Sequence, residues 1–372
     1  MFERGGQFPC PECGRSGCKA HDTVNKKWRH LNFFEHETYL HAQIPRVKCP
    51  DCGVRQVHVP WAREGSGFTL LFEAFLLTLA KEMPVNAVAR IVGEHDTRIW
   101  RVLHHYVEQA RSGRDDSDVT NVGLDETSTK RGHNYISLFV DMDKFRVLFA
   151  TPGKDARTLE AFREDLEAHG GQAEQIRHMC CDMSPAYIRG VEDTFPKAAI
   201  TFDKFHVMKA INEGVDEVRR MEQKTRPELH KSRYVWLKNP GNLRQSQKDT
   251  LERLDVKKLN LKTARAYHIK LTFQDLYDQS RRSAEAFLKR WYFWATHSRL
   301  QPMIDAARTI KRHWDGILQW FDSRISNGIL EGLNSLIQAA KAKARGYRST
   351  RNLVTIIYLI AGKLNVTLTH SQ

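Results

Sequence analysis

The sequence lacks a long hydrophobic run. Its richest apolar stretch, residues 68–80, is 13 residues long and contains Glu73, whereas a helix that spans a bilayer needs about 20 predominantly apolar residues. Residues 1–7 also lack the apolar core of a secretion signal. These absences disfavour membrane and exported proteins, and we expect a cytoplasmic protein.

Acidic residues are in the minority. The chain of 372 residues has 44 Asp and Glu against 58 Lys and Arg, which gives a formal net charge of +14. Such an excess favours a polyanionic partner, with nucleic acid as the first candidate. On charge alone, a basic protein without such a partner remains the alternative. The length predicts two or three packed units.

Cysteines are also few, seven in all, and in the cytoplasm they are more often thiols or metal ligands than disulfides. Four of them form two similar C-x2-C knuckles, Cys10-Pro-Glu-Cys13-Gly and Cys49-Pro-Asp-Cys52-Gly. Gly14 and Gly53 can take the positive φ that points backbone amides at sulfur. Four thiolates suit one tetrahedral Zn²⁺, so residues 1–66 are predicted to form a zinc ribbon with one structural zinc.

The gap between the two knuckles is 35 residues long, and a strand pair within residues 28–47 would fill it. Cys18 and His21 lie nearby and are candidates for a second metal site or a replacement ligand. We favour ordinary polar loop residues for this pair.

Residues 67–116 have a helical pattern. Leu71, Ala74, Phe75 and Leu79 fall on one stripe of a first helix, and Met83-Pro84 ends it. Two short helices joined at Gly93 follow, which is typical of a helix-turn-helix. Its second helix would present Asp96, Thr97, Arg98 and Arg101 to the DNA major groove. An ordinary helical hairpin is the alternative.

The next region, residues 117–206, changes to strands. Three strands are expected in succession, within residues 122–125, 133–141 and 145–150, followed by a helix over 155–169, a strand over 176–181, a helix from about 184 to 194 and a strand over 198–202. This order predicts an α/β (α+β) fold with a mixed, ribonuclease-H-like sheet, in which the first and fourth strands are neighbours. Asp125 and Asp182 follow those two strands and should emerge at one end of the sheet.

The remaining chain divides into two further parts. Residues 207–322 are helical, basic and rich in tryptophan, and they are predicted to form an all-α insertion domain. Residues 323–372 are predicted to return to the core with a helix that starts near Asn327, carries Glu331 and leads into a basic stretch. Lys341, Lys343, Arg345 and Arg348 of that stretch are candidate DNA contacts.

Carboxylates at strand ends suit phosphodiester chemistry, because two divalent metal ions roughly 4 Å apart can activate the attacking oxygen and stabilise the leaving one. Mg²⁺ prefers such hard oxygen ligands and needs only a few of them from the protein. Competing acids are Glu126, Asp141, Asp143, Asp193 and Asp203. Surface charge is the alternative for each, and Glu126 should face the opposite side of its strand from Asp125.

Several motifs together resemble the ISL3 family of bacterial insertion-sequence transposases. They are Gly123-Leu-Asp125-Glu126-Thr, Cys181-Asp182-Met183-Ser-Pro-Ala-Tyr187, Phe202-Asp203-Lys-Phe205-His206, Asn327-Gly328-Ile-Leu-Glu331-Gly332-Leu-Asn334 and Arg345-Gly346-Tyr347. The knuckles and the helix-turn-helix fit the family too, so nearly the whole chain is covered. Residues 44–48 are less basic than the family would suggest, which weakens the case that the ribbon itself grips DNA.

The resemblance implies a DDE active site. Asp125, Asp182 and Glu331 would hold two Mg²⁺ (or Mn²⁺) ions, and Asp203 and His206 match the C/D-x-x-H motif of such enzymes. A structural role for that pair is slightly favoured. An aromatic residue of the insertion domain would stack a displaced base, with Trp291 and Trp294 as candidates, although tryptophans in a helical domain are more often core residues.

The predicted function follows from these parts. The protein is expected to be a nucleoid-associated bacterial transposase that binds the terminal inverted repeats of an insertion sequence, cleaves the DNA and joins it to a target. Because two ends must be handled together, a homodimer or larger oligomer is expected. The alternatives are a catalytically silent DNA-binding regulator of transposase origin and a nuclease that cuts without joining strands.

Overall fold

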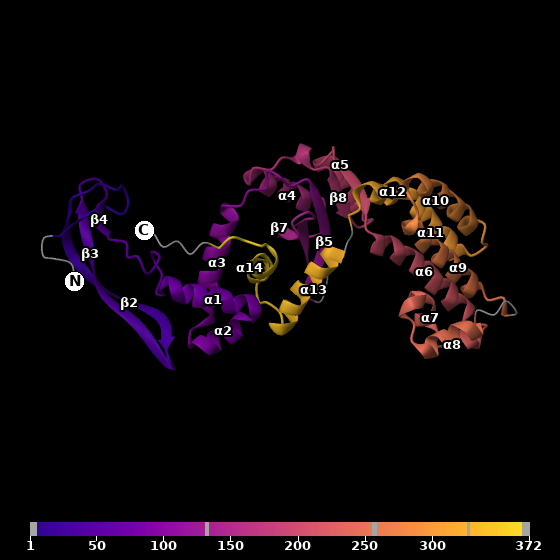
Figure 1. Ribbon diagram of the computed structural model, residues 1–372, viewed down its shortest axis with the longest axis horizontal. Coiled ribbons are helices and arrows are strands. Elements are labelled where there is room, and N and C mark those ends of the chain that lie inside the picture. Colours follow the sequence, from indigo (N-terminus) through magenta and orange to yellow (C-terminus); the bar gives the residue numbers. More distant parts are fainter. Residues whose placement is uncertain (1–5, 131–133, 255–258, 326–327, 367–372) are drawn as a thin grey trace. The chain divides into compact units, whose positions relative to one another are not determined.

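The computed structural model describes residues 6–130, 134–254, 259–325 and 328–366. These residues form two compact units (Figure 1), and each is described by itself. The first contains residues 1–114 and 339–372, and the second contains residues 115–338. The predicted strand start at His133 and the predicted helix start at Asn327 lie outside the described residues.

The first unit begins with an antiparallel sheet of four strands. β1 (Gln7–Phe8), β2 (Cys18–Phe33), β3 (His36–Cys49) and β4 (Gly53–Gln56) lie in that order in the sheet. The long hairpin of β2 and β3 confirms the predicted strand pair and extends beyond it. Cys18 and His21 belong to β2, so they are strand residues rather than the loop residues that the sequence suggested.

Helices complete the first unit: α1 (Leu70–Glu82), α2 (Val85–Val92), α3 (Asp96–Ser112) and α14 (Thr350–Ala361). Pro84 immediately precedes α2, and Gly93 has a φ of 71° in the turn between α2 and α3, which confirms both predicted boundaries. Arg29 of β2 is 1% exposed and lies 3.9 Å from the Glu94 carboxylate. The hairpin is thus attached to the helix-turn-helix at the turn itself.

The predicted stripe of α1 is wrong. The structure buries Leu70, Phe72, Leu76, Leu77 and Ala80, whereas Leu71 is 52% and Phe75 39% exposed. α1 is apolar nearly all the way round, so the pattern alone does not fix its inner face. Glu73 also faces inward, where it accepts hydrogen bonds from Arg63, Ser66 and Tyr106.

The C-terminal segment packs on the helix-turn-helix. His104 of α3 contacts Thr355 through Nδ1 at 2.8 Å and Asn352 through Nε2 at 3.1 Å, and Arg351 donates to Glu108 at 2.7 Å. From the sequence, this stretch was assigned to the end of the catalytic core. In the structure its packing partners are α1 and α3.

The second unit contains a mixed sheet of five strands, in the order β7-β6-β5-β8-β9. Its strands are β5 (Asn121–Lys130), β6 (Asn134–Asp141), β7 (Arg146–Pro152), β8 (His178–Cys181) and β9 (Ala199–Phe202). β5, β6 and β7 form an antiparallel meander, whereas β5, β8 and β9 are parallel. The first and fourth strands are therefore neighbours, as predicted.

Two helices accompany the sheet, α4 (Arg157–Ala168) and α5 (Pro185–Thr194). Leu159, Phe162 and Leu166 of α4 are all fully buried, which confirms the predicted inner face of this helix. The Phe162 ring stacks on Phe139 of β6 with ring centroids 4.3 Å apart. Burial of such large side chains against the strands anchors the edge of the sheet that carries the meander.

A helical part follows β9 (Figure 1): α6 (Lys204–Glu222), α7 (Arg233–Leu237), α8 (Gln245–Leu254), α9 (Lys262–Gln274), α10 (Arg281–Thr296), α11 (Gln301–Arg312) and α12 (Trp314–Ser323). α6 packs against α9 and α11, and α12 packs against β9. This part shares one continuous hydrophobic core with the sheet. α13 (Gly328–Lys343) comes next, and its residues 328–338 belong to the second unit.

Candidate functional site

Three aspartates lie in one row across the parallel strands of the sheet. Asp182 and Asp203 follow the last residues of β8 and β9, whereas Asp125 lies within β5, which continues to Lys130 instead of ending at Asp125 as the sequence predicted. The register pairs Gly123 of β5 with Cys180 of β8, so two further residues place Asp125 opposite Asp182. Cys181 of β8 pairs with Phe202 of β9, so one further residue places Asp203 beside Asp182. The register of the three parallel strands thus brings together two of the predicted triad residues and one of the competing acids.

Asp125 lies in a partly buried setting that opposes its ionisation. Burial raises the pKa of its carboxyl, while the backbone N–H of Glu126, the charge of His206 and the amide of Asn334 act in the opposite direction. The Glu126 N–H donates to Oδ1 at 2.7 Å and Asn334 Nδ2 donates to Oδ2 at 2.5 Å. A nearby cation would favour the charged form of this carboxylate.

Asp182 has a more open setting at the end of β8. Its Oδ1 accepts a hydrogen bond from the Ser184 N–H at 2.8 Å, which fixes the turn into α5. Pro185 stands at the first position of that helix, where its missing N–H costs nothing. The local sequence therefore directs the Asp182 carboxylate by its own backbone turn.

Asp203 and His206 form a pair at the start of α6. Asp203 is 3% exposed and caps the helix, accepting a hydrogen bond from the Phe205 N–H at 3.0 Å. His206 Nδ1 lies 2.9 Å from Asp203 Oδ2. That hydrogen bond raises the pKa of His206, and the charges of Asp203, Asp182 and Asp125 add to the effect. The pair is thus part of the helix start, and the imidazole of His206 also interacts electrostatically with the carboxylates of Asp125, Asp182 and Asp203.

α13 lies along β5 with its polar face toward the strand. Asn334 Nδ2 contacts Asp125 and also the carbonyl of Glu126 at 3.3 Å. One turn later, Gln338 Nε2 donates to Thr127 Oγ1 at 2.5 Å. α13 and β5 therefore run side by side, and one helical turn of α13 spans about two residues of β5.

Glu331 lies one turn before Asn334 on the same helix. Residues three apart lie on the same side of a helix, so Glu331 is on the side that contacts β5. It is exposed, and no other described residue forms a hydrogen bond or ion pair with it. In the described part of the chain, Cys10, Cys13, Cys49 and Cys52 form the only group of three or more metal-ligand atoms within 4.8 Å of one another. The carboxylate oxygens of Asp125, Asp182 and Glu331 are therefore too far apart in this structure to meet that criterion.

The close approach of α13 depends on a glycine. A Cβ atom at Gly123 would lie 2.5 Å from Met142 Sδ and 3.0 Å from Leu330 Cδ1. Leu330 is the residue before Glu331 and is 2% exposed. The absence of a side chain at Gly123 therefore lets the first turn of α13 reach the strand that carries Asp125.

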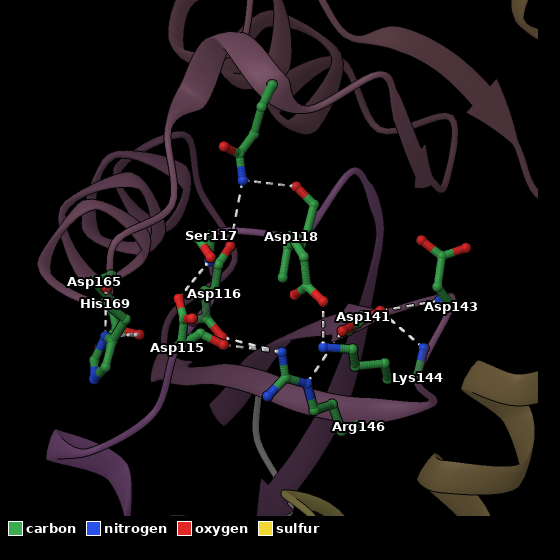
Figure 2. A network of polar contacts seen from close by, with 12 residues as sticks. Asp115, Asp116, Ser117, Asp118, Asp141, Asp143, Lys144, Arg146, Asp165 and His169 are labelled. Carbon is green, nitrogen blue, oxygen red and sulfur yellow. Dashed lines mark hydrogen bonds and ion pairs between the residues drawn. The ribbon is translucent and has the colours of Figure 1, made fainter.

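The competing acids have other partners. Glu126 accepts a hydrogen bond from the Tyr187 hydroxyl at 2.7 Å, which confirms that it faces away from Asp125. Figure 2 shows Arg146 between Asp116 and Asp141, at 3.2 and 3.1 Å. Asp141 pairs with Val122, three residues and so about 10 Å along β5 from Asp125.

Two further acids are also accounted for. Both carboxylate oxygens of Asp143 accept a hydrogen bond from Asn121 Nδ2 at 3.0 Å. Figure 2 shows the backbone N–H of Asp143 donating to Asp141. Asp193 is an exposed residue of α5. These acids have structural or surface settings, so the row across the parallel strands is the distinctive acidic feature of the sheet.

Asn334 and Gln338 contact β5, although neither was among the predicted site residues. Asn334 was quoted in the Asn-Gly-x-x-Glu-Gly-x-Asn motif, but only Glu331 was assigned. The available signal was spacing, because residues 331, 334 and 338 recur every three or four positions and so share one helical face.

The four predicted zinc ligands come together in the ribbon. The sulfur atoms of Cys10, Cys13, Cys49 and Cys52 all lie within 4.8 Å of one another. The backbone N–H groups of Cys52 and Asp51 lower the pKa of the Cys49 thiol to about 6. Gly14 and Gly53 have φ of 73° and 75°, as the knuckles require.

The other two metal candidates do not join this group. Cys18 is buried beside the four cysteines, with its sulfur 3.5 Å from the Arg15 carbonyl oxygen. His21 is exposed on β2. The four-cysteine cluster is therefore complete without either side chain.

The predicted DNA contacts on α3 differ in their settings. Thr97 and Arg101 are exposed. Arg98 is engaged within the protein, since its guanidinium lies 4.2 Å from the centre of the Phe68 ring and pairs with Glu94. Arg98 thus fastens the start of α3, which makes it less available than its neighbours for a base.

Trp291 does not suit the base-stacking role. It is 2% exposed, and its Nε1 donates to the Ile269 carbonyl at 2.8 Å, so it is a core residue that would have to leave the hydrophobic core to meet a base. Trp294, one helical turn away on α10, is 42% exposed. Trp236 and Trp314 are buried as well, in keeping with the core alternative.

Comparisons with known proteins agree with the three parts of this chain. A family model described as a transposase, of the ISL3 type, matches residues 122–357. The chain belongs to the ISL3 family of transposases. A helix-turn-helix domain of the same family matches residues 57–107, and a zinc finger of the IS204/IS1001/IS1096/IS1165 transposases matches residues 6–52.

Individual relatives extend over nearly the whole ISL3 chain. The transposase for insertion sequence element IS1557 of Mycobacterium tuberculosis is 29% identical, over 93% of this chain and 85% of the relative. The transposase for element IS1001 of Bordetella parapertussis is also 29% identical, over 91% of this chain and 85% of the relative. The chain is therefore a transposase with a DNA-binding helix-turn-helix and a zinc ribbon domain. Among its described helices, none is long and apolar enough to cross a membrane.

Proposed function

We propose that this transposase binds the terminal inverted repeats of an insertion sequence and catalyses metal-dependent strand cleavage and strand transfer. The observation that carries the proposal is the row of Asp125, Asp182 and Asp203 across the three parallel strands, with α13 hydrogen-bonded to Asp125 beside it. The strand order and the parallel β5–β8 pair support a ribonuclease-H-like core. DNA as partner would place the protein at the nucleoid.

The residues of this row fit a divalent metal ion. Asp125 and Asp182 supply hard oxygen ligands, and the buried Oδ1 atom of Asn334 has no hydrogen-bond partner among the described residues. Glu331 at the first turn of α13 would be the third carboxylate. Mg²⁺ or Mn²⁺, two per site, would lower the pKa of an attacking water or hydroxyl and stabilise the leaving oxygen.

The protein's own groups would orient the reaction. Asn334 and the Glu126 N–H hold the Asp125 carboxylate, and the Ser184 N–H holds that of Asp182. Holding reacting groups in place in this way accounts for a large part of catalysis in phosphoryl transfer. Asp203 keeps His206 at the edge of the row, where a protonated imidazole would attract a phosphate.

The four-cysteine group is proposed to bind one structural Zn²⁺. Its four sulfur atoms match the number and kind of ligands in a closed, tetrahedral site. Zinc would hold β1, the first knuckle and the β3–β4 turn together, a region with only a small hydrophobic core of its own. The ribbon would support end binding by the helix-turn-helix.

The test is a cleavage and joining assay with purified protein, Mg²⁺ or Mn²⁺ and DNA that carries the element's ends. Asp125→Ala, Asp182→Ala and Glu331→Ala should each abolish both steps while end binding persists. Asp193→Ala is the matched control, because Asp193 is an exposed acid of α5 outside the row, and it should retain full activity. Cleavage unchanged in Asp182→Ala would refute the assignment of the active site.

Two other results would favour the alternative functions. Specific end binding by the wild-type protein without cleavage under any metal condition would indicate a regulator, and nicks without joined products would indicate a nuclease. A synaptic complex of at least two protein chains with two DNA ends is expected, and its mass can be measured by light scattering.

A further inference from the structure

A pocket lies in the first unit where the two helices of the helix-turn-helix begin. Its volume is about 710 Å³. The start of α2, the start of α3 and the segment between α13 and α14 contribute its walls, through Asn86, Arg90, Thr97, Trp100, Arg345 and Arg348 among others. Residues some 250 positions apart in the sequence thus share one surface.

The pocket carries a surplus of positive charge that the protein does not neutralise. Arg90, Lys343, Arg345 and Arg348 line it and are exposed, and none of the four forms an ion pair with another described residue. Asp96 is the one acid among the lining residues, and its carboxylate lies 3.1 Å from His95 Nδ1.

Other arginines of this unit behave differently. Those at positions 15, 46, 55 and 351 each pair with an acid of the same unit. The pocket therefore brings together four cations that form no ion pair with another described residue. Unneutralised cations around a concave surface attract an anion.

Helix geometry adds to this field. Both α2 and α3 begin at the pocket, and neither has a hydrogen bond from a capping side chain. The N-terminus of a helix carries a partial positive charge and unused N–H donors. The cations and the two helix ends therefore act on the same space.

The basic segment is held in place by packing. The ring of Tyr347 meets the ring of Trp100 edge-on, with centroids 6.3 Å apart, and His104 of α3 contacts Asn352 and Thr355 of α14. Arg345 and Gly346 have positive φ of 55° and 91°, which turns the chain sharply between the two helices. The cations are thus positioned before any ligand arrives.

We propose that this pocket binds a backbone phosphate of duplex DNA beside the groove that receives α3, so that the C-terminal segment completes the DNA-binding domain. The proposal rests on DNA binding by the helix-turn-helix and deepens the proposed function. Phosphate contacts position a protein but carry no sequence information. The pocket should therefore contribute equally to element-end DNA and to DNA of unrelated sequence.

The experiment compares the double variant Arg345→Ala/Arg348→Ala with wild type by fluorescence anisotropy on two duplexes of equal length, one carrying the element end and one scrambled. Loss of the one phosphate contact should reduce the slope of log K against log salt concentration by about one. The affinity for both duplexes should fall by the same factor. Lys81→Ala, an exposed lysine of α1 outside the pocket, should change neither quantity.

A gain-of-binding variant separates the proposal from a folding defect. Asp96→Asn removes the pocket's acid while keeping its size, and it should strengthen binding to both duplexes. An unchanged salt slope in the double variant would overturn the proposal, and so would a loss confined to the element-end duplex. If the wild-type protein binds both duplexes equally well, the proposal of inverted-repeat binding is wrong. The salt slope on the scrambled duplex would still test whether the pocket binds a phosphate.

Discussion

Replacement of Asn334 by alanine tests how the active site is held together. Asn334 of α13 donates to the Asp125 carboxylate at 2.5 Å and to the Glu126 carbonyl at 3.3 Å. Alanine keeps the helix, because it has the highest helix propensity, but removes both hydrogen bonds. Asp125 and the first turn of α13 would then be free to separate.

The expected size of the effect follows from these contacts. A hydrogen bond to a charged group contributes about 1.5–3 kcal/mol, and each 1.4 kcal/mol corresponds to about a tenfold change in rate. If the hydrogen bond acts mainly on the alignment of Asp125 with Glu331, the cleavage rate should fall by about 10- to 100-fold. The half-saturating concentration of Mg²⁺ should rise as well, since the ligands are less well placed.

The assay measures single-turnover cleavage of element-end DNA over a series of Mg²⁺ concentrations, together with end binding and thermal stability. Ser335→Ala is the control, because Ser335 is the exposed neighbour on the same helix, and it should cleave like wild type. The reasoning is refuted if Asn334→Ala cleaves at the wild-type rate with unchanged metal dependence. Equal losses of stability and of DNA binding would instead assign Asn334 a purely structural role.

Three other predictions concern separate parts of the chain. Gly123→Ala places a Cβ 2.5 Å from Met142 Sδ, so it should cost about 1–3 kcal/mol of unfolding free energy and slow cleavage, as measured by denaturant unfolding and the same assay. Burial lowers the pKa of Lys270 to about 8, below its value in the unfolded chain. The unfolding free energy should therefore rise between about pH 8 and about pH 10, by at most about 2.5 kcal/mol. Lys270→Met should remove that rise, and a pH profile identical to that of the wild type would contradict the prediction. Elemental analysis of the wild type should find one equivalent of zinc and Cys49→Ser should abolish it, whereas undiminished zinc in the variant would exclude Cys49 as an essential ligand.

Local signals predicted the ends of β8 and β9 well, but not the end of β5, which continues to Lys130 beyond the predicted end at Asp125. β8 ends at Cys181 and β9 at Phe202, each directly before the aspartate that the sequence marked. Such ends are readable because a short apolar run followed by Asp changes both burial and turn preference at one position. Asp125 and Asp182 could therefore be placed together from topology before any contact was known.

The hydrophobic pattern predicted the wrong inner face for α1, because burial there does not follow hydrophobicity. α1 buries Glu73 and exposes Leu71 and Phe75, because Glu73 finds three hydrogen-bond donors inside the unit. A buried carboxylate is tolerated when its oxygens are hydrogen-bonded, but the sequence of α1 alone does not indicate which residues donate those hydrogen bonds. Tyr106 is contributed by α3 and Arg63 by the segment before α1, so the inner face is set by tertiary contacts.

The third carboxylate shows most clearly what a sequence cannot specify locally. Asp125 and Asn334 are joined across 209 positions, and no periodicity within either segment requires that contact. What makes it possible is a pair of complementary local features, a glycine in β5 that leaves room for Leu330 and a polar face on α13 that recurs every three or four residues. Either feature alone is ordinary, since strands contain glycines and exposed helices contain amides. Together they fix the helix against the strand, and the proposed role of Glu331 depends on that register, because Glu331 forms no hydrogen bond or ion pair with another described residue.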